Sequence, residues 1–306
     1  MFEIIRKVCD LPEDGKTIMF DWTDAVLGGG TYNLGWYLSH LGLSPILVAA
    51  LSQEKEDLII KAFKDANLRH TSLKPVEGAA DNLIAFSDNR THRSYFVKSK
   101  LPENFADRIV KSVDTGIFVF SGSRHREVQC AYMKLLQNSA AEMTVFAPSY
   151  TIYETGVDLV RKLVEKSDLV AINQREAEYV RCKFEASDMG ALAGRISGSL
   201  LVTLAGNGAE LWRGGKRVFI HSYTDTTDDV IGAGDAFLAG LLYVCAHRGE
   251  LIDACHVGAV LASFVVEKRN VRVSVSLDNL THKASELADN DRRAIDALES
   301  FKSASA

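Results

Sequence analysis

Residues 228–242 read DDVIGAGDAFLAGLL, and they set a Gly-Ala-Gly turn before an acidic residue and an apolar helix pattern. A helix that begins near Gly232 exposes backbone N–H groups without intrahelical partners, and its aligned peptide dipoles make that end partly positive. Because Gly232, Ala233 and Gly234 carry little or no side chain, a phosphate can approach their amides closely. A carboxylate at Asp235 would repel that phosphate unless it has its own task, such as taking the proton from an attacking hydroxyl. The stretch therefore predicts phosphoryl transfer to an alcohol, with Asp235 as the general base.

The same stretch has a simpler interpretation, in which Asp235 is an ordinary helix N-cap and Gly-Ala-Gly an ordinary turn. The usual nucleotide motifs are absent from the sequence. GGKR at 214–217 places Arg after Lys216 where a P-loop needs Ser or Thr, and no GxGxxG opens a first β-α unit. A P-loop NTPase and a Rossmann dehydrogenase are therefore disfavoured, and the context of the motif must decide.

The elements that would position this turn alternate along the chain from about residue 43 onward. Apolar strand patterns at 45–51, 116–122, 143–148 and 168–173 are separated by helical patterns at 55–68, 127–140 and 156–167. Strands that are apolar throughout and separated by helices predict a mostly parallel sheet buried on both faces, in a Rossmann-like α/β fold. Residues 198–223 predict a strand and a hairpin, 251–267 a tightly packed helix, and 282–306 a surface helix with a frayed tail.

Two stretches depart from this alternation. Residues 15–30 and 82–98 show polar and apolar residues in turn, and the second stretch reads as two strands around Ser-Asp-Asn. This pattern predicts an antiparallel flap with one exposed face, which we place at about 12–28 and 82–98.

Composition narrows the class of partner. The 306 residues carry a formal net charge of −5, with Lys and Arg scattered rather than clustered, so we expect neither nucleic acid nor a membrane surface as partner. No stretch approaches the roughly 18 apolar residues of a membrane span, and the five cysteines form no CxxC pair. We expect a cytoplasmic protein that binds small molecules.

Four landmarks together resemble a known family, the ribokinase-like (PfkB) carbohydrate kinases. DDVIGAGDAF resembles the family's Asp-x-x-Gly-Ala-Gly-Asp motif, with every fixed position filled, and GGGTYNLGWYLSHLG at 28–42 is similar to its Gly-Gly-x-x-x-Asn segment. NQREAE at 173–178 matches Asn-x-x-Glu, and VTLAGNGAELW at 202–212 resembles the nucleotide-side strand and turn. The landmarks follow the family's order over nearly the whole chain. The resemblance implies one ribokinase-like domain over 1–306, with a β-flap as lid, that uses ATP and Mg²⁺.

The resemblance also implies roles for residues on the phosphate side. Asp235 would be the base, and the amides of Gly232, Ala233 and Gly234 the anion hole. Asn173 and Glu176 would help hold Mg²⁺ through water, whereas the motif taken alone could also be a polar helix start after a strand. The nucleotide residues would be Thr203, Gly206, Gly208 and His256, the last facing adenine unless it is simply packed in its helix. Asp229 matches a position associated with a monovalent cation, usually K⁺, whose requirement is left open.

On the substrate side, the resemblance assigns Gly28, Gly29, Gly30 and Asn33, whose amides and side-chain amide would bind sugar hydroxyls. Glu3 falls near the place of an Asp that grips the sugar in family members, and the strand that should precede it would lie before Met1. Either translation begins upstream, which we expect as the simpler account, or the protein lacks the first strand of its sheet. Gly30 lacks the side chain of the ribokinase lysine, and VFSGSRH at 119–125 lacks an acid for the sugar. Ribose itself is therefore disfavoured.

Taken together, these features predict an ATP-dependent kinase that phosphorylates a primary hydroxyl of a sugar or sugar-like molecule, in a homodimer formed through the flap. A nucleoside kinase is the first alternative, favoured if Tyr32 or Trp36 stacks on a base. A catalytically silent sugar-binding or regulatory protein is the second, although it would have no need to keep Asp235 behind the glycine turn.

Overall fold

A six-stranded sheet forms the centre of the larger layer, in the order β12-β11-β10-β9-β8-β7. The computed structural model describes residues 2–7, 26–52, 56–76, 82–87, 92–97, 115–123, 125–138, 140–225, 231–268, 270–286 and 292–305. Strands β7 (Ile117–Ser121), β8 (Met143–Ala147), β9 (Leu169–Asn173) and β10 (Ser199–Thr203) run parallel. β11 (Ala209–Arg213) and β12 (Lys216–Ile220) add an antiparallel hairpin at one edge. The predicted mostly parallel α/β fold is confirmed.

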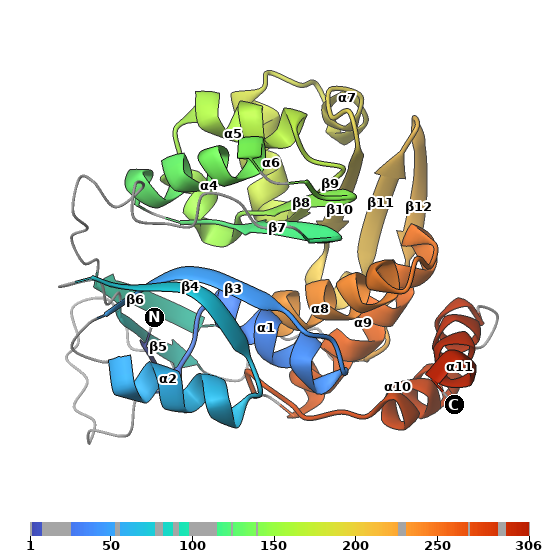
Figure 1. Ribbon diagram of the computed structural model, residues 1–306. Helices are drawn as coiled ribbons and strands as arrows, with labels where there is room; N and C mark the ends of the chain where they lie inside the picture. The colour runs from blue at the N-terminus through green and yellow to red at the C-terminus, as the bar shows by residue number, and fades with distance from the viewer. Residues whose placement is uncertain are drawn as a thin grey trace.

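Helices cover both faces of this sheet (Figure 1). One face packs against α4 (Arg126–Asn138), α5 (Val157–Glu165), α6 (Gln174–Lys183) and α7 (Met189–Ala193). The other packs against α1 (Gly30–His40), α8 (Ala233–Ala246) and α9 (Leu251–Lys268). Burial on both faces explains why Leu169, Val170, Leu200 and Leu201 of β9 and β10 are apolar without alternation, each being at most 1% exposed.

A smaller layer holds the other strands. β1 (Phe2–Lys7), β2 (Val26–Leu27), β5 (Asn82–Ser87) and β6 (His92–Val97) form a sheet in the order β2-β1-β5-β6, and β5 pairs with β6 antiparallel, as the alternating pattern predicts. β3 (Ile46–Ser52) and β4 (Arg69–Val76) pair in parallel beside α2 (Glu56–Asp65). Only residues 26–28 of the predicted flap segment 12–28 lie within the described residues. Its closure as a lid stays a prediction.

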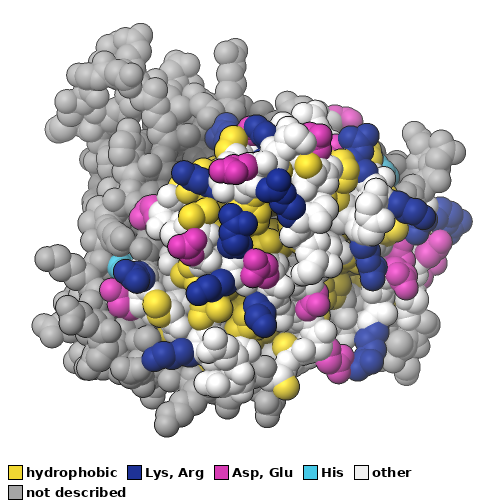
Figure 2. Space-filling view, turned by 90° about the horizontal axis from the view of Figure 1, so that it is seen from above, with side chains coloured by type: hydrophobic (Ala, Val, Ile, Leu, Met, Phe, Trp, Pro, Cys, Tyr) yellow, Lys and Arg dark blue, Asp and Glu magenta, His cyan; other side chains and the backbone are white. Residues whose placement is uncertain are grey.

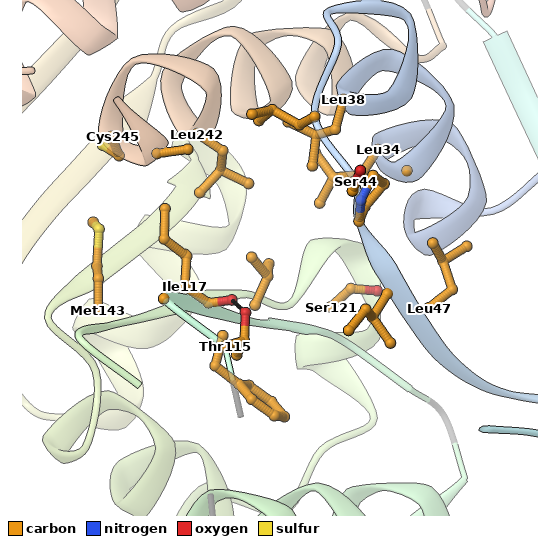
Figure 3. A pocket seen from close by; sticks show the side chains of 18 of the residues that line it. Leu34, Leu38, Ser44, Leu47, Thr115, Ile117, Ser121, Met143, Leu242 and Cys245 are labelled. Carbon is orange, nitrogen blue, oxygen red and sulfur yellow. Dashed lines mark hydrogen bonds between the residues drawn. The ribbon is translucent and has the colours of Figure 1, made fainter. Parts of the chain in front are cut away.

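β7 and β3 end their respective sheets, and a cavity of about 520 Å³ lies between them (Figure 3). Ile46 and Leu47 of β3, Ile117 and Val119 of β7, and Leu242 of α8 contribute to its mostly apolar lining. β1 does not fill this space, because it pairs with β2 and β5 in the smaller layer. The cavity therefore has a strand edge on each side.

The C-terminal region differs from the predicted surface helix with a frayed tail. α10 (Leu277–Glu286) leads to α11 (Arg293–Ser305), which packs against α9 and α10. Ile295, Leu298 and Phe301 of α11 are 6%, 0% and 7% exposed. Their spacing of three residues puts them on one helix face, which is buried rather than frayed.

The charges on one face of the molecule can be seen in Figure 2. Seen from above, over the α4–α7 layer, Lys and Arg side chains are mixed with Asp and Glu rather than gathered into one patch (Figure 2). In the part of the chain that the structure describes, no helix is both long enough and apolar enough to cross a bilayer.

Candidate active site

The Gly-Ala-Gly turn forms the start of α8. Gly232 is the N-cap residue with a left-handed backbone (φ 94°), and α8 begins at Ala233. A Cβ added at Gly232 would lie 2.7 Å from the carbonyl oxygen of Val271, whereas one at Gly234 would meet nothing within 4 Å. Gly232 is therefore required both by its backbone angle and by the close approach of Val271. Among the described residues nothing covers Gly234, so the helix N-terminus is open there, as an anion site needs.

Asp235 lies in the first turn of α8, where the N-terminus of α1 meets it. The Asn33 side-chain amide Nδ2 donates to Asp235 Oδ2 at 2.9 Å. A Cβ added at Gly30, the first residue of α1, would lie 3.3 Å from Asp235 Oδ1. Two helix N-termini thus converge on one carboxylate, and the phosphate-side motif and the substrate-side motif of the sequence meet there.

The surroundings of Asp235 perturb its proton affinity. Burial raises its pKa above the ordinary 3.8, while the hydrogen bond from Asn33 and the guanidinium of Arg272 act in the opposite direction. A carboxylate with a raised pKa is a stronger base than a free aspartate, which suits proton abstraction near neutral pH.

Asn33 is 2% exposed, and both polar atoms of its side chain are used. Besides the bond to Asp235, its Oδ1 accepts from Arg272 Nη1 at 2.7 Å. Arg272 was not predicted, because it belongs to no motif and is 239 residues away in the sequence. The predicted contact of Asn33 with substrate hydroxyls stays a prediction, and its observed partners are Asp235 and Arg272.

The remaining substrate-side residues lie next to α1. Gly28 is buried, and Gly29 is the N-cap of α1 with φ 99°. Glu3 of β1 pairs in register with Val26 of β2, two residues before Gly28. Its backbone is thus close to the glycine segment, as the prediction for Glu3 requires, and its side chain lies outside the described ones.

Asn173 and Glu176 form a capping box at the start of α6. Asn173 Oδ1 accepts from the Glu176 backbone N–H at 2.9 Å, and Glu176 Oε2 accepts from the Asn173 backbone N–H at 3.0 Å. Glu176 is 4% exposed, and burial raises its pKa to about 7 against the effect of these hydrogen bonds. The helix-start interpretation of Asn-x-x-Glu is confirmed.

The fit of this pair to Mg²⁺ can be judged from its donors. Among the described residues, no group of three or more His, Cys, Asp or Glu side chains could hold a metal ion. A single carboxylate fits a hydrated Mg²⁺ held through water, since Mg²⁺ keeps several waters and takes phosphate oxygens as ligands. Direct coordination by a protein cage does not fit, and the water-mediated role stays a prediction.

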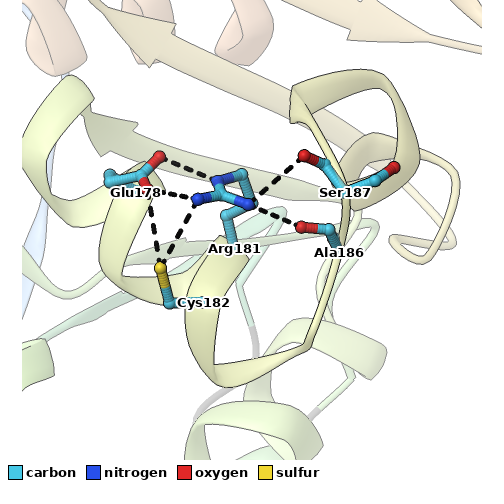
Figure 4. Close-up of polar contacts among 5 residues, drawn as sticks. All are labelled: Glu178, Arg181, Cys182, Ala186 and Ser187. Carbon is cyan, nitrogen blue, oxygen red and sulfur yellow. Dashed lines mark hydrogen bonds and ion pairs between the residues drawn. The ribbon is translucent and has the colours of Figure 1, made fainter.

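The other end of α6 is fastened by Arg181 (Figure 4). Its guanidinium donates to both carboxylate oxygens of Glu178 and to the carbonyl oxygen of Ala186, which lies after the helix end. The ion pair is exposed and contributes little to stability by itself. Its bond to Ala186 nevertheless ties the turn after α6 to the helix that carries Glu176.

The predicted nucleotide residues follow the ends of neighbouring strands. Thr203 ends β10 in register with Asn173, so the two lie side by side at the carboxyl edge of the sheet. Gly208 has φ 91°, and a Cβ there would lie 2.2 Å from the carbonyl oxygen of Ile220. Gly206 lies in the short helix η3 (Ala205–Asn207) just before it. Thr203 thus ends a strand and Gly206 and Gly208 lie in the turn after it, and their contact with a nucleotide stays a prediction.

His256 is 2% exposed in α9, and its Nδ1 is 3.1 Å from the hydroxyl of Tyr223. This position agrees with a packed histidine, and its contact with adenine stays a prediction. The neighbouring His221 was missed by the sequence analysis. Its ring is 5.3 Å from that of His256, and its Nε2 is buried without a hydrogen-bond partner in the described structure. Asp229 lies outside the described residues.

The cavity between β3 and β7 is not the site of this chemistry. It reaches the convergence of α1 and α8 only at Thr31 and Ser121, whose hydroxyl oxygens are 2.9 Å apart. Its apolar lining offers little to a phosphate or a sugar. The polar groups around Asp235, rather than the hollow of Figure 3, define the candidate active site.

Comparison with known proteins agrees with this geometry. The family model for pfkB family carbohydrate kinases matches residues 10–278. The nucleoside kinase of Methanocaldococcus jannaschii is 21% identical over 286 residues, which cover 89% of this chain and 90% of that protein.

Solved structures share the fold at low sequence identity. The M. jannaschii nucleoside kinase has a TM-score of 0.74 at 18% identity, with 93% of this chain and 95% of that chain covered. The Burkholderia thailandensis nucleoside kinase in complex with inosine has 0.76 at 16% identity, covering 94% and 96%. Thermotoga maritima ribokinase has 0.69 at 14% identity, covering 99% and 96%. With its family model matched over residues 10–278, and with the glycine turn and Asp235 in the places that the motif requires, this chain belongs to the pfkB family of carbohydrate kinases.

Proposed function

We propose that this protein is an ATP-dependent kinase that transfers the γ-phosphate to a primary hydroxyl of a sugar or sugar-like molecule. The observation that carries the proposal is the position of Asp235, behind the open N-terminus of α8 and in a hydrogen bond with Asn33 of α1. The N-terminus of a helix attracts a phosphate, whereas a carboxylate beside it repels one. The two are compatible when the carboxylate takes the proton from the hydroxyl that attacks the phosphorus.

In the proposed reaction, the hydroxyl oxygen of the acceptor attacks the γ-phosphorus while its proton passes to Asp235. The bond between the γ-phosphorus and the β–γ bridging oxygen breaks, so that ADP leaves. The amides of Gly232, Ala233 and Gly234 would stabilise the charge that develops on the transferring group. Closure of the flap, where β5 and β6 lie, would exclude water that would otherwise be phosphorylated.

ATP would lie along Thr203, Gly206 and Gly208. Glu176 would hold Mg²⁺ through water, and the ion would neutralise charge on the nucleotide phosphates. The proposal for Asp229, a site for K⁺ beside the anion hole, rests on the family motif alone.

A nucleoside is the second candidate acceptor, favoured by the likeness to two nucleoside kinases. The stacking residues suggested by the sequence do not strengthen it. Tyr32 is 9% exposed and stacked on Phe63 at 5.6 Å, and Trp36 is stacked on His40 at 3.7 Å. A base would therefore need another surface.

We also propose a cytoplasmic homodimer that pairs through the flap. Within the described residues the four-stranded sheet ends at β2 and β6, so these strands would offer backbone groups to a second copy. Sedimentation of the purified protein would test this state, and a monomer at all concentrations would contradict it.

A coupled ADP-release screen tests the function. The panel holds sugars, sugar acids, amino sugars and nucleosides, with ATP, Mg²⁺ and either K⁺ or Na⁺. We expect one acceptor class to release ADP, and Asp235→Asn to lower turnover by a factor on the order of 10² to 10⁴ while nucleotide binding persists. Turnover of Asp235→Asn at the level of the wild type would contradict the mechanism. A protein that binds a panel member but transfers no phosphate would instead favour the silent binding protein.

A further inference from the structure

Arg272 reaches the start of α1 from the segment that follows α9. Its Nη1 donates to the carbonyl oxygen of Leu27 at 2.8 Å and to Asn33 Oδ1 at 2.7 Å, and its Cζ lies 5.0 Å from the centre of the Tyr32 ring. Two hydrogen bonds and a contact with an aromatic ring thus hold the guanidinium in place, and Arg272 is half-buried.

This contact determines how the amide of Asn33 is turned. A side-chain amide has one accepting oxygen and one donating nitrogen, and Arg272 can only donate. With Oδ1 held by Arg272, Nδ2 faces Asp235 and donates to Oδ2. The reversed amide would set two donors against each other at Arg272 and two acceptors against each other at Asp235. Arg272 therefore selects the orientation in which Asn33 binds the carboxylate.

The bond from Asn33 occupies one of the two oxygens of Asp235. Within the described structure the other, Oδ1, has no hydrogen-bond partner and faces Gly30, which has no side chain to cover it. We propose, on the basis of the function proposed above, that Arg272 is a positioning residue: acting through Asn33, it holds the Asp235 carboxylate so that Oδ1 is presented to the acceptor hydroxyl.

The positive charge of Arg272 also favours the basic form of Asp235, because it stabilises the ionised carboxylate and so lowers its pKa. The other groups that face Asp235 in the described structure are neutral: Asn33 and Tyr37 of α1, and the amides of its own helix start. Burial raises the pKa of Tyr37 to about 12, so it stays uncharged near neutral pH. Arg272 is therefore the positive group that offsets the burial of the base.

The segment around Arg272 has other anchors that do not need its side chain. The hydroxyl of Tyr37 donates to the carbonyl oxygen of Val271 at 3.2 Å and accepts from the backbone N–H of Val273 at 3.1 Å. Substitution of Arg272 should therefore leave the segment in place.

The test compares Arg272→Gln, Arg272→Lys and a matched control, Arg217→Gln. Arg217 also lies over an aromatic ring, Trp212 at 5.7 Å, and donates to a side-chain oxygen of Glu210, but it is on β12 away from Asp235. We expect Arg272→Gln to lower kcat by up to about 100-fold while KM for ATP is unchanged. We also expect the acid limb of the kcat profile to move up by about one pH unit. Arg272→Lys should restore part of the pH shift, and Arg217→Gln should match the wild type.

A double-mutant cycle with Asn33→Ala tests whether the effect passes through Asn33. If it does, Arg272→Gln should change kcat much less in the Asn33→Ala background than in the wild type. Full additivity, or an unchanged profile in folded Arg272→Gln, would overturn the proposal.

A readout without turnover separates this proposal from the proposed function. The carboxyl titration of Asp235, followed by carbon NMR, should shift to higher pH in Arg272→Gln and not in Arg217→Gln. If the wild-type protein transfers no phosphate to any acceptor, the kinase proposal fails, and Arg272 then loses its role in transfer even where the titration shifts. If the kinase is active and the titration does not shift, the role of Arg272 alone is overturned.

Discussion

Gly240 of α8 and Gly258 of α9 face each other so closely that a Cβ added at Gly240 would lie 2.9 Å from the Cα of Gly258. A Cβ at Gly258 would in turn lie 2.6 Å from the carbonyl oxygen of Phe237. Side chains at these positions would force the two helices apart, because backbone atoms cannot yield as a flexible side chain can. The contact fixes the axis of α8, and with it the position of Asp235.

This contact predicts that Gly258→Ala destabilises the protein by about 1–3 kcal/mol, as overpacking of a core does. We expect a loss of kcat as well, since a shift of α8 moves Asp235 relative to Asn33. Urea unfolding and ADP release measure the two effects. Gly116→Ala is the matched control, because a Cβ there meets nothing within 4 Å. Equal stability of the two variants would contradict the role of the helix contact.

Gly232→Ala should lower turnover, because it displaces the backbone amides that we propose as the anion hole. Its φ of 94° and the Val271 carbonyl oxygen 2.7 Å from an added Cβ both oppose alanine, so the start of α8 must move. Gly215→Ala, in the β11–β12 hairpin, also has positive φ (73°) but meets nothing within 4 Å. We expect both variants to lose about 1 kcal/mol or more of stability but only Gly232→Ala to lose turnover. Full turnover in folded Gly232→Ala would argue against the anion hole.

Asn173→Ala removes the N-cap of α6, so we expect a loss of about 1 kcal/mol in the free energy of unfolding. Asn173→Ser keeps a capping oxygen and should lose less. Chemical unfolding with a chelator present measures the cap without any contribution from bound metal. If both variants have the same free energy of unfolding as the wild type, the stabilising role of the cap is contradicted.

The stability contribution of Glu176 should depend on pH with a defined sign. Burial raises its folded pKa to about 7 from an ordinary 4.5, so the folded state binds the proton more tightly than the unfolded state. Stability from this group is therefore full below about pH 4.5 and is lost as pH rises towards about 7, by about 3 kcal/mol at most.

Glu176→Gln carries no titrating proton and serves as the reference. With a chelator present, we expect the stability of the wild type relative to Glu176→Gln to fall between pH 5 and pH 7 and then to level. Thermal or urea unfolding at several pH values measures this difference. A difference that stays constant with pH would show that Glu176 does not titrate in this range.

Much of the fold was predictable because the central strands are buried on both faces and therefore apolar without interruption. The helix-start interpretation of Asn173 and Glu176 could likewise be predicted, since a capping box is a local pattern. Arg272 could not, because its role depends on contacts with residues more than 200 positions away that no spacing rule connects.

The C-terminal helix was predicted as a surface helix with a frayed tail because its few large apolar residues stand among many charges in 282–306 and the tail ends in small polar residues. Its burial depends on α9 and α10 being present to receive Leu298 and Phe301, which is a property of the tertiary structure. β1 (Phe2–Lys7) was not predicted as a strand, and its pairing with β2 and β5 in the smaller layer is likewise a property of the tertiary structure.

The two strand edges beside the cavity of about 520 Å³ have a consequence for the protein in concentrated solution. β3 and β7 each end a sheet within the described structure, and Ile46 of β3 is 40% exposed. Unpaired backbone groups next to an apolar hollow are a template for an extended peptide from another molecule. Self-association of this protein on storage or heating should therefore begin at these edges, and a charged residue in place of Ile46 should delay it.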